Sequence, residues 1–185
     1  MRNKLISKLV CASLATATIF GAAGTASAST QGSLGTTSTG SVSISATVPS
    51  RVRISGLTDV AFTNVDPGLD ASNAQSVCVW SNTSTRGYQL TATGSGAGNA
   101  FTLANASLTV PYTVEWSGSS GQTSGTALSS GSALTGLTSA ATNANCASGP
   151  ASSASLIVKI GSASLQTMAA STSYTGTLTL LVAPE

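Results

Sequence analysis

Strict alternation of apolar and hydroxyl side chains in residues 41–48 is the feature that most restricts the fold of this chain. Successive side chains of an extended strand point to opposite faces, so a period of two indicates a β-strand with one apolar face. Pro49 follows and cannot donate a ladder hydrogen bond, so it ends or offsets the strand. The apolar positions of this strand are Val42, Ile44, Ala46 and Val48.

Short runs with the same alternation recur along the rest of the chain, with turns between them. We expect strands in residues 52–54, 60–65, 74–81, 87–94, 107–118, 154–162 and 173–184, and a weak strand within residues 127–137. Pro111 lies inside one of these runs and favours an edge position or a bulge. No segment keeps a helical period with caps over three turns. Many short strands at near-regular spacing predict one all-β sandwich with Greek-key connections.

The first 28 residues have the layout of a secretory signal peptide. A positively charged start precedes an apolar run in residues 9–20, and a small-x-small site predicts cleavage between Ala28 and Ser29. A membrane anchor is the alternative, but a spanning helix needs about 20 apolar residues. Cys11 lies within the apolar run, which disfavours attachment of a lipid there. The basic residues of this segment are Arg2, Lys4 and Lys8.

Cleavage would leave a polar leader in residues 29–40 and a sandwich domain in residues 41–185. The leader has no apolar face, so we expect it to be flexible. Three of the seven basic residues leave with the signal peptide, so four basic residues remain against five acidic ones. Nucleic-acid binding needs a basic face or stripe, and this balance predicts none.

The exported chain keeps two cysteines, Cys78 and Cys146. Two cysteines in an exported protein most simply form one disulfide. A metal site would need further ligands, and the chain has no histidine at all. We therefore expect a structural disulfide and no metal.

No constellation in the sequence points to an enzyme. The absence of histidine removes the usual general base, and no serine has an activating partner in the sequence. Lys159 lies within a strand, where a solvated strand face is the favoured interpretation. Asp66 and Asp70 lie close in sequence, but Ca²⁺ needs six to eight oxygens and their spacing matches no known loop, so turn formation is preferred. We expect no catalytic residue and no cofactor.

Three aromatic residues, Trp80, Tyr112 and Trp116, are candidates for a carbohydrate-binding platform. Tyr112 and Trp116 are in phase with the apolar face of their strand. Packing in the core is therefore the favoured interpretation for these two.

Four segments resemble bacterial chaperone–usher pilins, particularly the archaic class with spore coat protein U-like domains, and the CS1-type fimbrial major subunits are the near alternative. Residues 39–54 resemble the amino-terminal donor strand running into the first strand of the domain. The other three segments are residues 60–68, 108–118 and 171–184, which read VAFTNVDPG, LTVPYTVEWSG and STSYTGTLTLLVAP.

The resemblance implies an immunoglobulin-like sandwich that lacks one strand and is completed by donor-strand insertion. A neighbour's residues Val42, Ile44, Ala46 and Val48 would fill the open groove by β-strand addition. The implied partners are other pilin subunits, a periplasmic chaperone and an outer-membrane usher. The expected location is the periplasm in transit and then a cell-surface fimbria for adhesion or biofilm formation.

A self-complete secreted sandwich that binds a surface or a glycan, as a module or an adhesin, is the alternative function. The two readings differ in what the strand at residues 41–48 pairs with. It either completes its own sheet or completes a neighbour's, and the sequence alone leaves both open.

Overall fold

The structure is a computed structural model that describes residues 29–185. The predicted signal peptide and its cleavage site at Ala28 therefore lie outside the described residues. The chain divides into one unit that ends at Thr47 and a second that runs from Val48 to Glu185. Every strand and helix found in residues 29–185 belongs to the second unit.

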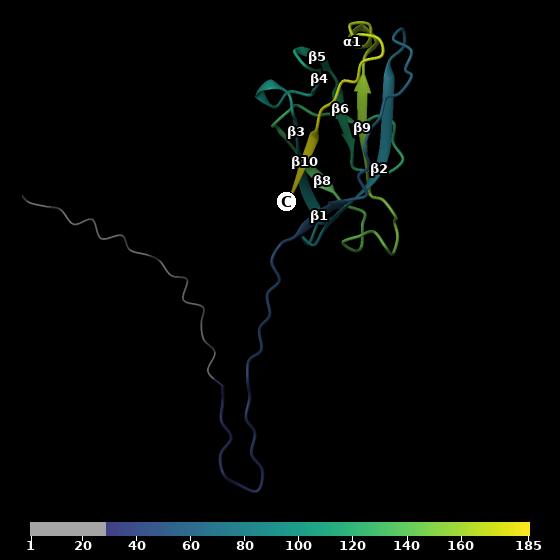
Figure 1. Cartoon of the computed structure of the whole chain (residues 1–185). Helices are drawn as coiled ribbons and strands as arrows, with labels where there is room; N and C mark the ends of the chain where they lie inside the picture. The colour runs from purple at the N-terminus through teal and green to yellow at the C-terminus, as the bar shows by residue number, and fades with distance from the viewer. Residues whose placement is uncertain (1–28) are drawn as a thin grey trace, which may run out of the picture. The chain divides into compact units, whose positions relative to one another are not determined.

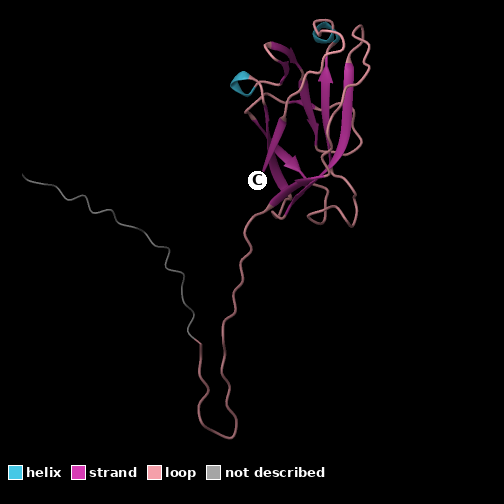
Figure 2. Ribbon diagram, viewed as in Figure 1, coloured by secondary structure: helices cyan, strands magenta, loops and turns pink. Residues whose placement is uncertain are grey.

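Two antiparallel sheets build the second unit, so the predicted all-β sandwich is confirmed (Figures 1 and 2). The first sheet has the order β1-β2-β9-β6-β7, formed by Val52–Ser55, Ala71–Ser81, Ala154–Ile160, Thr113–Ser117 and Thr126–Ala127. The second has the order β10-β3-β8, formed by Leu178–Pro184, Gly87–Gly94 and Ala133–Thr138. A separate hairpin, β4-β5, comprises Thr102–Asn105 and Leu108–Pro111. A 3-10 turn, η1 (Ala97–Asn99), and a one-turn helix, α1 (Ser162–Leu165), complete the elements.

The core lies between the inward faces of the two sheets, where the period-two pattern places the apolar side chains. Trp116 on β6 and Tyr88 on β3 are each 1% exposed, and the Trp116 Nε1 donates to the Tyr88 hydroxyl oxygen at 3.1 Å. This bond satisfies the polar atoms of both aromatic side chains across the two sheets, as burial requires. The other large, fully buried core residues are Val77, Val79, Leu90, Val110, Val114 and Ile160.

Several strand predictions are confirmed and others are wrong. β3 has the predicted bounds, and the predicted strand at 107–118 is divided at Tyr112 into β5 and β6, next to Pro111. The predicted strand at residues 60–65 does not form. Residues 102–105 form β4, which their weak alternation did not indicate.

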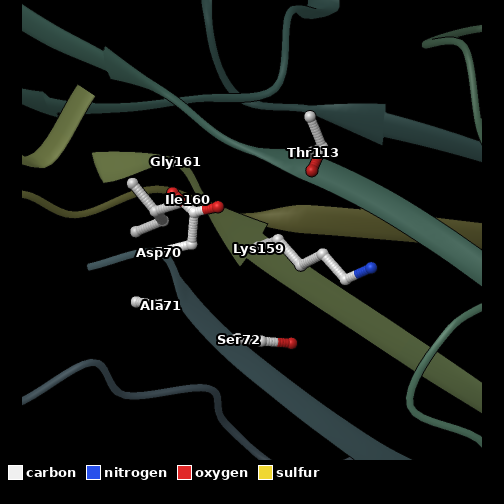
Figure 3. Close-up of a pocket in the computed structure, with 7 residues that line it drawn as sticks. All are labelled: Asp70, Ala71, Ser72, Thr113, Lys159, Ile160 and Gly161. Atoms are coloured by element: carbon white, nitrogen blue, oxygen red, sulfur yellow. The ribbon is translucent and has the colours of Figure 1, made fainter. Parts of the chain in front are cut away.

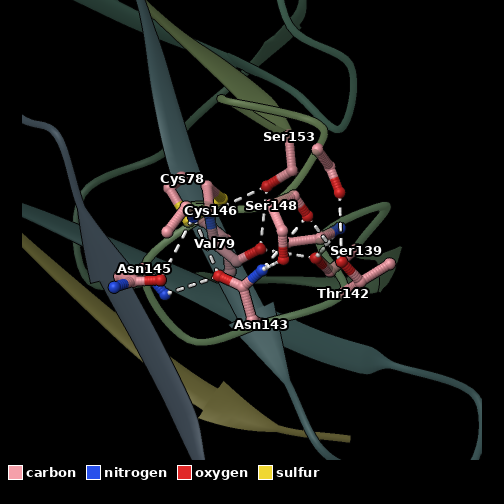
Figure 4. The surroundings of a disulfide bond; sticks show 12 residues. Cys78, Val79, Ser139, Thr142, Asn143, Asn145, Cys146, Ser148 and Ser153 are labelled. Carbon is pink, nitrogen blue, oxygen red and sulfur yellow. Dashed lines mark hydrogen bonds between the residues drawn. A yellow bond between two sulfur atoms is a disulfide. The ribbon is translucent and has the colours of Figure 1, made fainter.

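Cys78 and Cys146 form the predicted disulfide, with a sequence separation of 68 residues. Val77 and Val79 face the core, so Cys78 lies on the outward face of β2, where it ties down the loop at residues 139–153 (Figure 4). The Ser153 hydroxyl donates to the Val79 carbonyl oxygen at 2.8 Å and accepts from the Val79 N–H at 2.8 Å. The loop is thus held to the edge of β2 by a covalent bond and by hydrogen bonds.

Candidate functional site

An apolar groove of about 1280 Å³ opens along one side of the sandwich. One wall is the irregular segment at residues 57–65, and the other is formed by residues 168–177 together with β10. The floor is made of core side chains, namely Tyr112, Leu156, Val158, Ile160 and Leu165. The groove therefore exposes a strip of the core itself.

The first wall leaves its sheet because β1 ends early. Gly56 has a φ of +79°, a conformation that glycine adopts without strain, and the last β1 pair is Ser55 with Cys78. Beyond this point the Gln75 side chain acts as the hydrogen-bonding partner of Thr58: its Oε1 accepts from the Thr58 N–H at 2.8 Å, and its Nε2 donates to the Thr58 carbonyl at 3.0 Å. The Gln75 side-chain amide thus takes the place of the backbone hydrogen bonds that would pair Thr58 with β2, and residues 57–65 stay out of the sheet.

The second wall is an unpaired strand edge. β10 pairs with β3 along seven residues, and no other strand in residues 29–185 pairs with its opposite edge. Its inward side chains, Leu178, Leu180 and Val182, are only half-buried, whereas Ala92 and Leu90, the β3 partners of Leu180 and Val182, are buried. The groove consequently offers both free backbone hydrogen-bonding groups and incompletely covered apolar surface.

Two contacts hold the segment after β9, which contributes Leu165 and residues 168–177 to the lining of the groove. Asp70 Oδ1 accepts from the Ser162 N–H at 2.7 Å at the start of α1, and this bond lowers the pKa of the Asp70 carboxyl. The Tyr174 hydroxyl accepts from the Ala169 N–H at 3.2 Å. Tyr174 is 8% exposed, so its ring packs under this segment.

The predicted donor residues are not in any strand of the described chain. Thr30 and Ser41 form an isolated antiparallel bridge, with both backbone N–O distances at 2.9 Å, and residues 42–48 are unpaired. Val42, Ile44 and Val48 are 72%, 90% and 79% exposed, and Ala46 is also exposed.

The candidate chemical residues do not converge on a reactive centre. Asp66 Oδ1 accepts from the Gly68 N–H at 2.8 Å within its own turn, whereas Asp70 binds Ser162. A small pocket of about 380 Å³ contains Asp70 and Lys159, and Figure 3 shows the Lys159 ammonium group pointing away from Asp70. In residues 29–185, no group of three or more His, Cys, Asp or Glu residues is placed to bind a metal ion.

Lys159 instead pairs with Glu115 on the outward face of the first sheet. The Lys159 Nζ lies 2.6 Å from Glu115 Oε1, and Glu115 Oε2 accepts from the Gly125 N–H at 2.9 Å. These two interactions lower the pKa of the Glu115 carboxyl. The lysine is a structural member of a cross-strand pair.

The Glu115 pair predicts a small, pH-dependent contribution to stability. Because its pKa is lower in the folded chain, Glu115 stabilises the fold above its usual pKa of 4.5, and this contribution is lost as the pH falls through the lowered value. We expect Glu115→Gln to lower the melting temperature by up to about 3 °C at pH 7 and to have no effect near pH 2. Melting curves from pH 2 to pH 7 test this, and a difference that persists at pH 2 would contradict it.

The aromatic candidates for carbohydrate binding are divided between two clusters. Tyr112 and Trp116 are buried in the core as predicted, and burial raises the pKa of the Tyr112 hydroxyl. Trp80 is half-buried on the outward face of β2, where it packs against the disulfide cluster. The three side chains therefore do not form one exposed platform.

Two polar residues were missed in the sequence analysis: Gln75, which lines the groove, and Asn82, which does not. Gln75 is in phase with Val77 and Val79 on the inward face of β2, and an amide in phase with core residues is a signal that its polar atoms have a hydrogen-bond partner. Asn82, which binds the chain just before β1, lies in a turn whose composition carries no comparable signal.

No protein-family model matches this chain, and neither does any curated protein. Within residues 29–185 no helix combines the length and the apolar character needed to cross a membrane.

Proposed function

We propose that this protein is a structural subunit of an extracellular fimbria, exported and assembled by the chaperone–usher route through donor-strand exchange. The observation that carries the proposal is the unpaired edge of β10 beside an apolar groove, in a chain that also has an exposed, alternating apolar segment. Strand addition joins two such surfaces through main-chain hydrogen bonds and through side chains that enter the groove alternately.

The strand order supports an incomplete immunoglobulin-like topology. Constant-type immunoglobulin sandwiches pair strands A, B, E and D in one sheet and C, F and G in the other. The order β1-β2-β9-β6 corresponds to A-B-E-D, and β10-β3 corresponds to F-C. Among residues 29–185 the position of strand G, beside β10, is the one left unfilled.

The proposed donor segment matches this position in length and in pattern. The predicted donor strand at residues 41–48 has eight residues, and β10 has seven. Side chains on one face of a strand repeat every two residues, about 6.6 Å apart. Four apolar side chains would therefore lie along the groove floor while the hydroxyl side chains face outward.

The reach of the chain favours a donor segment from another copy. β10 ends and β1 begins at the same end of the sandwich, next to the turn at residues 82–86. If the chain's own segment ran antiparallel to β10, Val48 would lie about 20 Å from that end. The four peptide units from Val48 to Val52 span at most about 14 Å. A neighbour's segment has no such restriction.

Insertion of the donor segment of one copy into the groove of the next is a head-to-tail, heterologous contact. Contacts of this kind generate open polymers. Before assembly, the exposed groove and edge would promote aggregation. The proposal therefore includes two assembly partners. A periplasmic chaperone covers the groove, and an outer-membrane usher is the place where the donor segment of the next subunit replaces the chaperone.

Removal of residues 29–48 tests the proposal. We expect the chain from Ser29 to form heat-resistant polymers and the chain from Pro49, which keeps the whole sandwich, to remain monomeric. Size-exclusion chromatography with light scattering and electron microscopy measures both states. A stable monomer from the longer chain would overturn the proposal and favour a self-complete binding module, for which a ligand screen is the next experiment.

A further inference from the structure

A single side chain, that of Asn82, holds the connection between the proposed donor segment and β1. Asn82 Oδ1 accepts from the Arg51 N–H at 2.6 Å, and Asn82 Nδ2 donates to the Pro49 carbonyl oxygen at 2.9 Å. The backbone N–H of Asn82 also donates to the Arg51 carbonyl oxygen at 3.1 Å. Since Val52 pairs with Ser81, these bonds continue the β1–β2 ladder beyond the first residue of β1.

This clamp opposes the one route by which the chain could fill its own groove. The antiparallel route is too long for the chain, which leaves insertion parallel to β10, with Val48 placed near Pro184. The chain would then have to reverse direction before it enters β1 at Val52. A reversal within three residues turns the Pro49 carbonyl and the Arg51 N–H away from the end of β2, so it breaks both side-chain bonds to Asn82.

We propose that Asn82 is a positioning residue that favours strand insertion into a second copy over insertion into the chain's own groove. The inference rests on the proposed function, because it concerns which copy supplies the donor strand. Asn82 does not line the groove, so it acts only through the backbone of residues 49–51, which its side chain binds. Two exposed hydrogen bonds to neutral groups correspond to roughly a tenfold change in equilibrium constant.

The test compares refolded chains that begin at Ser29. We expect Asn82→Ala to raise the fraction of monomer roughly tenfold relative to wild type at the same protein concentration. For both chains this fraction should rise on dilution, because insertion within one chain is unimolecular whereas insertion between copies is not. Asn145→Ala, which removes an exposed asparagine from the disulfide loop, is the matched control and should polymerise like wild type.

A synthetic peptide of residues 41–48 shows whether the groove of each monomer is filled. The Asn82→Ala monomers should fail to bind it, because their own segment occupies the groove. Monomers of the double variant Asn82→Ala/Ile44→Asp should bind it, because the charged segment cannot enter. The inference is overturned if Asn82→Ala polymerises like wild type, or if its monomers bind the peptide as the double variant does. In either case, polymers formed by wild type would leave the proposed function standing. If wild type forms no polymers, the proposed function and the inference both fall.

Discussion

Ile44→Asp is expected to abolish polymerisation while the sandwich itself stays folded. Ile44 is at the centre of the alternating apolar face and is 90% exposed, so its replacement removes no contact from the subunit core. In the groove of a neighbour, however, the variant would lose the burial of an isoleucine, worth about 2 kcal/mol or more, and would place a carboxylate on an apolar floor. Together these costs weaken strand addition by roughly a thousandfold or more.

The adjacent substitution Ser43→Asp is the matched control. It introduces the same charge one residue away, on the hydroxyl face that would point out of the groove, so we expect assembly within about tenfold of wild type. Electron microscopy and light scattering measure the polymers, and circular dichroism with melting curves measures the subunit fold. Equal polymerisation of the two variants would refute the assignment of Val42, Ile44, Ala46 and Val48 as the inserting face.

The strands that were predicted best are those whose partner lies within the chain. β3 alternates cleanly, β9 keeps Leu156, Val158 and Ile160 in phase, and each strand is paired on both sides, so local pattern and tertiary pairing agree. Residues 60–65 alternate less cleanly and have no ladder partner. Just before them, the backbone of Thr58 is held by hydrogen bonds to the Gln75 side chain and not by a neighbouring strand. A period of two indicates which face of a segment is apolar, but pairing depends on a neighbour that the segment itself does not encode.

The same reasoning explains what the sequence revealed of the candidate site. The apolar face of the donor strand could be predicted because its pattern is local: the residues from Val42 to Val48 alternate with a period of two. The resemblance implied an open groove, but the residues that line it were not predicted, because residues 57–65, the segment after α1 and the free edge of β10 lie far apart in the chain. Gln75 and Asn82 were missed for a related reason, since their roles depend on which backbone groups the fold leaves without a strand partner.

The largest expected effect on stability comes from removing the disulfide. A closed loop with a sequence separation of 68 residues restricts the unfolded chain enough, in the chain-entropy model, to contribute about 4 kcal/mol to the free energy of unfolding. We expect Cys78→Ala/Cys146→Ala to lose about that amount and to melt roughly 12 °C below wild type. The two thiols of wild type should react with thiol reagents only after reduction, because the cysteines are bonded and are 4% and 6% exposed.

The position of the disulfide separates this loss of stability from the proposed function. Cys78 faces outward from β2, whereas the groove opens toward the inward faces of the sheets, and Ser153 keeps its hydrogen bonds to Val79 without the disulfide. Below its melting temperature, the double cysteine variant should therefore still polymerise through residues 42–48. Denaturant unfolding measures the stability, and Ser148→Ala, in the same loop, is the control. A folded variant that no longer polymerises would show that the loop shapes the groove, in contradiction to this prediction.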